Sequence, residues 1–279
     1  MNVFQVAWLT DIHLNFLEPE PLEFFLTMLE KKSWDALVIT GDISESVDFG
    51  DYLKLLQIRF HRPVYFVLGN HDYYYSSLSK VWASAYRLHM ENSLLHWLPC
   101  SGIVPLTNDT ALIGHDGWAD ARYGDFEHSQ IVMNDYLLIK ELSDCFDETE
   151  TKALQDKLHE LGDTVARYFY NILPKALQQY EHVILATHVP PFPEACIFDE
   201  EIDRQDWLPH YSCKVVGDVL KEIMEQYPQN KLTVLCGHTH SAQQVNISSN
   251  IQVFTGGSEY CSPEIQKIFE IESCQLNYA

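Results

Sequence analysis

The sequence predicts an α/β fold, in which strands of a sheet alternate with helices that cover it. Short apolar runs rich in β-branched residues recur along the chain, and between several of them apolar residues recur at helical spacing. This alternation is typical of layered α/β domains. A chain of 279 residues can bury one large core. We therefore expect a single domain over residues 1–279.

Eight apolar runs are predicted as strands, and two segments between them are predicted as helices. Segment 22–29 has leucine or phenylalanine every three or four residues, and segment 215–223 repeats this pattern with valine, leucine and isoleucine. The predicted strands are Val3–Leu9, Ala36–Thr40, Val64–Leu68, Ala111–Gly114, Val183–Thr187, Leu232–Cys236, Ile251–Thr255 and Lys267–Ile271.

One stretch interrupts the alternation. Residues 115–180 contain no convincing strand, and residues 154–172 have apolar side chains at steps of three and four, which marks one face of a helix. We interpret 115–180 as a helical, cap-like insertion on the α/β core, and we attribute the apolar stripe to core packing.

Polar side chains with metal-ligand chemistry follow five of the predicted strands. In an open α/β sheet, ligands bind outside the carboxyl ends of the strands, so these side chains are expected to converge. Glycines at 41, 69 and 237 allow the tight turns that a crowded site needs. The side chains are those of Asp11 and His13; Asp42; Asn70, His71 and Asp72; His188; and His238 and His240.

These residue types suit transition metals. Carboxylate, imidazole and amide oxygen are ligands for manganese, iron, zinc or nickel, whereas a thiolate site would need cysteines. Asp11 and His13 are two positions apart, so at an extended strand end they point the same way, and His238 and His240 repeat this spacing. A single one of these strand-end motifs is weak evidence, but five of them in this order are specific.

The five blocks D-x-H, GD, GNHD, H and GHxH resemble the calcineurin-like metallophosphoesterase superfamily, and they span residues 11 to 240. The resemblance implies a four-layer αββα sandwich with two divalent transition metals at its edge. By position, one metal would be held by Asp11, His13, Asp42 and His240. The other would be held by Asp42, Asn70, His188 and His238, with Asp42 bridging.

The resemblance also implies catalytic roles beside the metals. A water activated by both metals would attack phosphorus, and Asn70 would help to bind the phosphoryl oxygens. His71 would protonate the leaving group, and Asp72 would orient and charge the His71 imidazole. The implied activity is hydrolysis of a small phosphomonoester or phosphodiester, such as a nucleotide-like ester.

Departures from the pattern narrow the branch of the superfamily. Purple acid phosphatases have tyrosine where this chain has Glu45, so a ferric–tyrosinate site is not expected. Protein serine/threonine phosphatases have an arginine in the GD block and GNHE later, and this chain has neither. The chain is more similar to the cyclic-nucleotide phosphodiesterase and small-phosphoester branches, and its insertion resembles that of uncharacterised bacterial members.

Two residues of the insertion are candidates for substrate contacts. Trp118 could stack on a base or sugar, and Arg122 could bind a phosphate. The alternative, which we favour slightly, is a folded loop with a buried tryptophan and an Arg–Asp pair. At least two of Tyr73, Tyr74 and Tyr75 are expected to serve packing.

The composition limits the possible partners. The formal net charge is −22, which repels nucleic-acid backbones, so stable nucleic-acid binding is not expected. Bound dications still allow a small phosphorylated substrate. No apolar run is long enough to span a membrane, and the start of the chain does not read as a signal peptide. Seven scattered cysteines fit reduced thiols in the cytoplasm.

Two alternatives to a small-molecule phosphoesterase stay open at this point. One is a nuclease, as in the recombination-nuclease branch, although the chain has no basic run to hold DNA. The other is a non-catalytic scaffold on the same fold, as the retromer subunit is. Scaffolds tend to lose ligands or the acid, whereas Asp42, His71 and His240 are all present. The sequence does not distinguish monoester from diester, and it does not give the oligomeric state.

Overall fold

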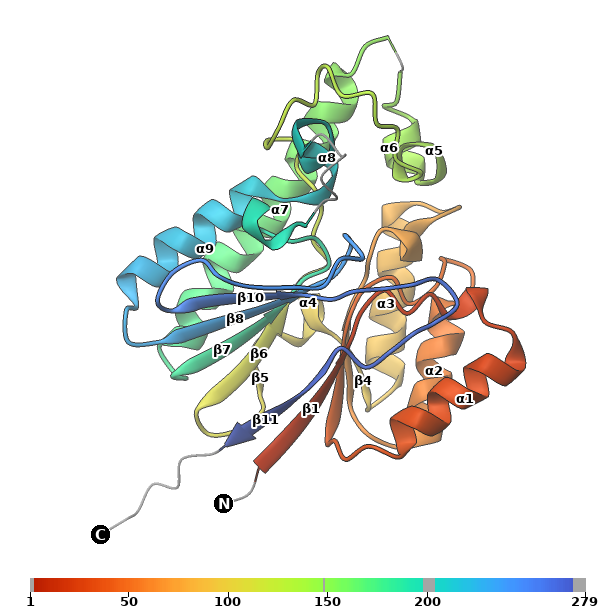
Figure 1. Ribbon diagram of the computed structural model, residues 1–279, viewed down its shortest axis with the longest axis vertical. Coiled ribbons are helices and arrows are strands. Elements are labelled where there is room, and N and C mark those ends of the chain that lie inside the picture. The colour runs from red at the N-terminus through yellow and green to blue at the C-terminus, as the bar shows by residue number, and fades with distance from the viewer. Residues whose placement is uncertain (1–2, 148, 198–203, 273–279) are drawn as a thin grey trace.

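The chain forms two sheets that face each other, with helices on both outer faces (Figure 1). The computed structural model describes residues 3–147, 149–197 and 204–272. Helix, sheet, sheet and helix form four layers, so the α/β sandwich expected from the sequence is confirmed.

The first sheet has the strand order β11-β1-β2-β3-β4. Strand β11 is antiparallel to β1, and the other neighbours are parallel. The strands are β1 (Val3–Leu9), β2 (Ala36–Thr40), β3 (Val64–Val67), β4 (Leu95–Trp97) and β11 (Lys267–Glu272).

The second sheet has the strand order β5-β6-β7-β8-β10-β9. Its four central strands are parallel, and the edge strands β5 and β9 are antiparallel to their neighbours. The strands are β5 (Val104–Pro105), β6 (Thr110–Gly114), β7 (His182–Ala186), β8 (Lys231–Cys236), β9 (Gln243–Asn246) and β10 (Ile251–Thr255).

Long helices cover the outer faces of both sheets (Figure 1). The first sheet is covered by α1 (Pro19–Glu30), α2 (Phe49–Phe60) and α3 (Leu78–Glu91), and the second by α7 (Lys152–Leu177) and α9 (Lys214–Gln226). The short helices are α4 (Leu98–Ser101), α5 (Asp135–Leu138), α6 (Lys140–Ser143) and α8 (Arg204–Tyr211), with 3-10 turns η1 (Leu14–Phe16), η2 (His71–Tyr73) and η3 (Pro193–Ala195).

The period-two pattern of the strands builds two cores. Along β1, Val6 and Trp8 belong to the core between the sheets, which also takes Ile184 of β7. The alternate residues Ala7 and Leu9 belong to the larger core beneath the helices. Because both faces of the sheets are buried, the strands read as continuous apolar runs.

All eight predicted strands are present, with bounds that differ by one residue at most. Strands β4, β5 and β9 were not predicted, because they are short or polar and carry no clear apolar run. Short strands at sheet edges need little apolar surface of their own, since they pair on one side only.

The segment predicted as an insertion, 115–180, contains two different parts. Helix α7 packs against α9 and lies over β6 and β7, so it belongs to the outer helical layer. Residues 115–151 contain only α5 and α6 among their described residues, and these helices stand beyond the end of the sheets, near α8 (Figure 1). This second part lies where a cap over the strand ends would lie.

In the described ranges, no helix is both long enough and apolar enough to cross a lipid bilayer.

Candidate metal centre

The loops that follow β1, β2, β3, β7 and β8 meet at one edge of the two sheets, and they bring the predicted ligands together. The backbone amide of Asp11 donates to the carbonyl of Gly41, and that of His13 donates to the carbonyl of Asp42. The His238 amide donates to the Asp11 carboxylate. These bonds join loops that lie far apart in the sequence.

The loop backbone at this edge is unusual. Nine non-glycine residues in the described part of the chain have positive φ angles, a region that side chains rarely adopt. Such conformations persist where the surrounding structure enforces them, and they cluster at functional sites. Five of the nine are predicted ligands, namely Asp11, His13, Asp42, His238 and His240.

Two glycines allow the carboxylates to sit close to the backbone. A Cβ atom at Gly237 would collide with the Asp11 carboxylate, and one at Gly69 would collide with that of Asp42. Two of the three glycines predicted at these turns are therefore required by the geometry.

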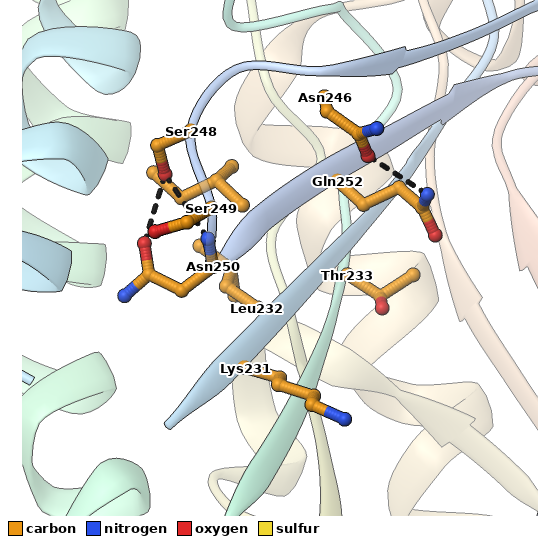
Figure 2. A pocket seen from close by; sticks show the side chains of 9 residues that line it. Lys231, Leu232, Thr233, Asn246, Ser248, Ser249, Asn250 and Gln252 are labelled. Carbon is orange, nitrogen blue, oxygen red and sulfur yellow. Dashed lines mark hydrogen bonds between the residues drawn. The ribbon is translucent and has the colours of Figure 1, made fainter. Parts of the chain in front are cut away.

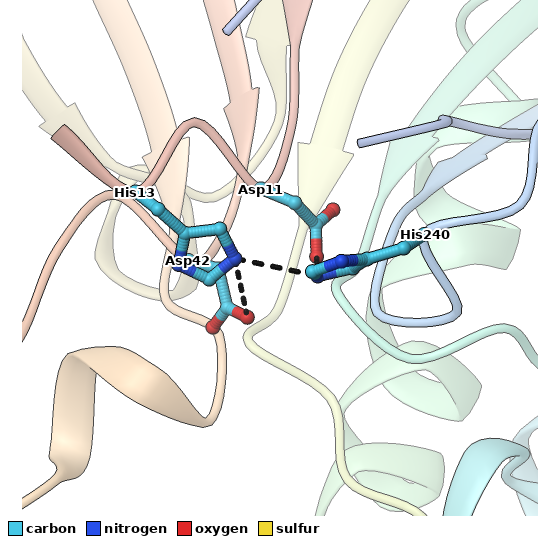
Figure 3. A group of neighbouring side chains, drawn as sticks. All are labelled: Asp11, His13, Asp42 and His240. Atoms are coloured by element: carbon cyan, nitrogen blue, oxygen red, sulfur yellow. Dashed lines mark hydrogen bonds and ion pairs between the residues drawn. The ribbon is translucent and has the colours of Figure 1, made fainter. Parts of the chain in front are cut away.

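The first donor group consists of Asp11, His13, Asp42 and His240, whose ligand atoms all lie within 4.8 Å of one another (Figure 3). The Nε2 atoms of His13 and His240 are 3.3 Å apart. His13 Nε2 is 3.7 Å from Asp42 Oδ2, and His240 Nε2 is 3.3 Å from Asp11 Oδ1. Two imidazole nitrogens and two carboxylates thus point at one small volume.

The second donor group lies on the other side of Asp42. The amide oxygen of Asn70 is 2.9 Å from His188 Nε2 and 2.9 Å from His238 Nδ1. His188 Nε2 is also 3.5 Å from Asp42 Oδ1. Since Asp42 gives Oδ2 to the first group and Oδ1 to the second, it lies between the two groups, in the position predicted for a bridge.

Backbone carbonyls fix which nitrogen each histidine of the second group presents. His188 Nδ1 donates to the carbonyl of Thr40 over 2.8 Å, and His238 Nε2 donates to the carbonyl of His210 over 3.0 Å. The opposite nitrogen of each ring therefore carries a lone pair toward Asn70 and Asp42. Metal-binding histidines commonly have such partners.

The electrostatics also fit bound cations. Burial lowers the pKa of His13 and of His238 to about 4, so both rings are neutral at neutral pH, which is the form that binds metals. Burial and then the adjacent Asp11 carboxylate raise the pKa of Asp42 well above its ordinary value. Buried carboxylates this close need a cation to be stable in their charged form.

Asp135, which sequence reasoning missed, holds the Asn70 amide in place. Its Oδ1 atom accepts from Asn70 Nδ2 over 2.9 Å and from the Tyr74 hydroxyl over 2.8 Å. With its nitrogen held, the Asn70 amide keeps its oxygen toward His188 and His238. Asp135 is 65 residues from Asn70, and no motif marked it.

His71 lies beside Asp42 at the wall of a cleft. Its Nε2 atom is 3.9 Å from Asp42 Oδ2, and its side chain is 15% exposed. The ring packs against Tyr74 and His13, with centroids 4.3 and 4.6 Å apart. Burial lowers the pKa of His71. A bound phosphate anion would raise that pKa again, because an adjacent negative charge favours the imidazolium.

Asp72 accepts hydrogen bonds from backbone amides of two loops. It is fully buried, and its two oxygens accept the backbone N–H groups of Ile43, Ser44 and Gly69 at 2.9 to 3.0 Å. These bonds join the loop after β2 to the loop after β3. Asp72 thus fixes the loop that carries His71, whose ring packs against Tyr74 and His13. The predicted role of Asp72 in orienting and charging the His71 imidazole stays a prediction.

The two predicted substrate contacts lie away from the cleft. Trp118 is buried and packs against Tyr73, with ring centroids 5.1 Å apart. Arg122 pairs with Asp120 at 3.1 Å and with Asp163 at 2.7 Å, which ties the loop to α7. These contacts agree with a folded loop that holds a buried tryptophan and an Arg–Asp pair, and a contact of either residue with substrate stays a prediction.

The cleft opens directly over the donor groups and encloses about 370 Å³. Its floor is formed by donor residues, and His71 stands at its wall. Its walls come from the segment before α5, from α8 and from the loop after β10. The lining residues are Asp42, Asn70, His71, Tyr74, Ile131, Val132, Met133, Asn134, Trp207, Tyr211, His238, Thr239, His240 and Tyr260.

A second hollow, of about 400 Å³, lies among the start of β8, the end of β9 and the start of β10 (Figure 2). Its polar groups bond to one another: the Ser248 hydroxyl to Asn250, and the Gln252 amide to Asn246. Lys231 is the one charged residue in its lining. This hollow carries no set of metal donors among the described residues.

Known proteins share this fold. The family model for calcineurin-like phosphoesterases matches residues 4–242. A phosphopantetheinyl hydrolase of Mycobacterium tuberculosis superposes with a TM-score of 0.66 at 14% identity, covering 99% of this chain and 98% of that one. A dimetal phosphatase of Danio rerio superposes with a TM-score of 0.55 at 15% identity, covering 92% of this chain and 88% of that one.

A curated Bos taurus protein, a transmembrane protein with a metallophosphoesterase domain, is 33% identical over 95 residues. The match covers 33% of this chain and 21% of that protein, so the chain spans about a fifth of the relative's length. Together with the family match over most of the chain, the motif order and the convergence of the donors lead to one conclusion. The chain belongs to the calcineurin-like phosphoesterase family.

Proposed function

We propose that the chain hydrolyses a small phosphoester, a monoester or a diester, in the cleft above Asp42. The observation that carries this proposal is the pair of donor groups that share Asp42 at the floor of the cleft. The cleft of about 370 Å³ suits a substrate of nucleotide size or smaller.

In this proposal each donor group holds one divalent transition metal. The ligands are those predicted, and manganese, iron, zinc and nickel all suit carboxylate, imidazole and amide donors. Two such ions would activate a water and neutralise charge on the phosphoryl oxygens. Asp42 keeps the two groups together, and the Asn70 oxygen faces His188 and His238 because Asp135 holds the amide nitrogen.

His71 is the proposed proton donor to the leaving group. Its ring stands at the cleft wall, within 3.9 Å of Asp42, and it is partly exposed to the space that a substrate would fill. General acid catalysis of this kind contributes about 10²–10⁴-fold in rate. Tyr74 packs against the His71 ring, and Asp72 fixes the loop that carries His71.

A panel of small phosphoesters tests the proposed function. Metal-loaded protein is expected to hydrolyse at least one mono- or diester of nucleotide size or smaller, and to leave duplex DNA intact at physiological salt. A polyanion would have to bind a chain with net charge −22, and such binding weakens steeply with salt. Protein treated with a chelator serves as the control. Efficient degradation of duplex DNA would favour a nuclease, and inactivity on every ester would favour a scaffold.

A second prediction concerns Asp135. Replacing it with alanine frees the Asn70 amide to rotate, so metal affinity of the second donor group is expected to fall about 10–100-fold, with the first group unaffected. Manganese titration calorimetry measures both affinities. Asp144→Ala is the matched control, because Asp144 is exposed and forms a surface ion pair with Lys140. Equal affinities in wild type and Asp135→Ala would remove this positioning role.

A further inference from the structure

We infer that the substrate is a phosphodiester with one phosphate group and two organic substituents, of which at least one is planar and apolar. This inference rests on the proposed function, and it names the substrate class of the same cleft. Three features of the cleft support it: its lack of lysine and arginine side chains, its aromatic rings on two sides, and its aliphatic wall.

The first feature is charge. All 18 lysine and arginine residues lie in the described ranges, and none of them lines the cleft. Arginine and lysine are the side chains with which proteins bind phosphate groups away from a metal. Away from the donor groups, the lining offers a second phosphate rings, aliphatic side chains and uncharged donors such as Asn134 and Thr239. Hydrogen bonds from uncharged donors are weaker than those from lysine or arginine, so they would compensate less for the lost hydration of the phosphate. The cleft therefore favours one phosphate, held at the donor groups.

The second feature is the position of the aromatic rings. Tyr260 lies beside the first donor group, with its centroid 4.7 Å from that of His13 and 5.2 Å from that of His240. Tyr211 lies beside the second group, 4.9 Å from His238, and Trp207 packs against Tyr211 at 5.3 Å.

Because the two donor groups flank Asp42, these rings flank the position of the phosphate on two sides. A phosphomonoester has one organic substituent and would leave one set of rings uncovered. A phosphodiester has two substituents and can cover both. A monoester carries nearly two negative charges at neutral pH. A diester carries one, which suits a cleft without lysine or arginine side chains.

The third feature is the wall formed by the segment before α5. Ile131, Val132 and Met133 line the cleft, and the Val132 side chain is 51% exposed. Tyr260, on the opposite loop, is 48% exposed. Both residues present apolar surface that a planar substituent would cover. Stacking on the Tyr260 ring would contribute to binding without any charge.

Four esters that share the same leaving group, p-nitrophenolate, test the inference. They are p-nitrophenyl phosphate, methyl p-nitrophenyl phosphate, thymidine 5′-(p-nitrophenyl phosphate) and the p-nitrophenyl ester of thymidine 5′-triphosphate. The thymidine diester is expected to have the highest kcat/KM, about tenfold or more above each of the others. The methyl diester separates the effect of charge from that of the planar group, and the triphosphate ester tests the limit to one phosphate.

Substitutions locate the effect in the cleft. Tyr260→Ala and Trp207→Ala are each expected to lower the ratio of kcat/KM for the thymidine diester to that for the methyl diester by roughly two- to tenfold. Tyr170→Ala, an exposed tyrosine of α7 outside the cleft lining, is expected to leave this ratio unchanged.

The outcomes separate the inference from the proposed function. Turnover of none of the four esters would contradict the proposed function itself. Turnover in which the monoester or the triphosphate ester equals or exceeds the thymidine diester would overturn the inference alone. An unchanged ratio in both cleft variants would likewise overturn it.

Discussion

A His71→Asn variant is expected to lose about 10²–10⁴-fold in kcat/KM on alkyl phosphoesters and much less on p-nitrophenyl esters. An alkoxide is a poor leaving group that needs a proton, whereas p-nitrophenolate leaves without one. His71 lines the cleft beside Asp42 and is outside both donor groups, so metal content should stay near that of the wild type. Steady-state kinetics on a matched ester series measures the difference.

The control for this variant is His61→Asn. His61 is exposed at the end of α2, and its φ of 52° suits asparagine. It should behave as the wild type on both kinds of ester. If His71→Asn lost the same factor on alkyl and p-nitrophenyl esters while keeping its metals, His71 would have no role as an acid.

An Asp42→Ala variant is expected to lose at least about 100-fold in kcat/KM on every ester, whatever the leaving group. Removing even an indirect partner of a metal ligand commonly costs 10–100-fold, and Asp42 faces both donor groups. Asp51→Ala is the matched control, since the Asp51 side chain is 80% exposed on α2. Activity of Asp42→Ala equal to that of the control would exclude Asp42 from the site.

The sequence was sufficient for features that depend on local pattern. Apolar runs gave the strands, because a strand buried on both faces must be apolar throughout. Donor residues at strand ends gave the convergence, because parallel strands bring their carboxyl ends to one edge. Asp11 and His188 are far apart in sequence, yet both could be assigned to this edge.

The remaining features depend on contacts across the chain that no local pattern encodes. Asp72 sits in the GNHD motif next to His71, yet its carboxylate turns inward to backbone amides of another loop. Asp135 belongs to no motif, and its role follows from its hydrogen bonds with Asn70 and Tyr74, which are distant in sequence. Trp118 and Arg122 have side chains that can contact a substrate. In the structure Trp118 packs against Tyr73, and Arg122 pairs with Asp163, both distant in sequence.

The cleft wall shows the same limit. Tyr260 and Trp207 come from segments without a recognised motif. The sequence alone does not distinguish an aromatic residue in a core from one that lines a cleft. Their role depends on where the loop after β10 and helix α8 lie relative to the donor groups. That placement follows from tertiary packing.

Metal content measures whether Asp42 is shared by two bound metals. Wild-type protein and Asp42→Ala would be loaded with manganese in parallel, freed of loosely bound ions, and analysed for metal per folded chain, with circular dichroism confirming the fold. Two metals per wild-type chain and none in Asp42→Ala would be the result that the shared carboxylate predicts. One metal or none in the wild type, or undiminished metal in Asp42→Ala, would contradict it.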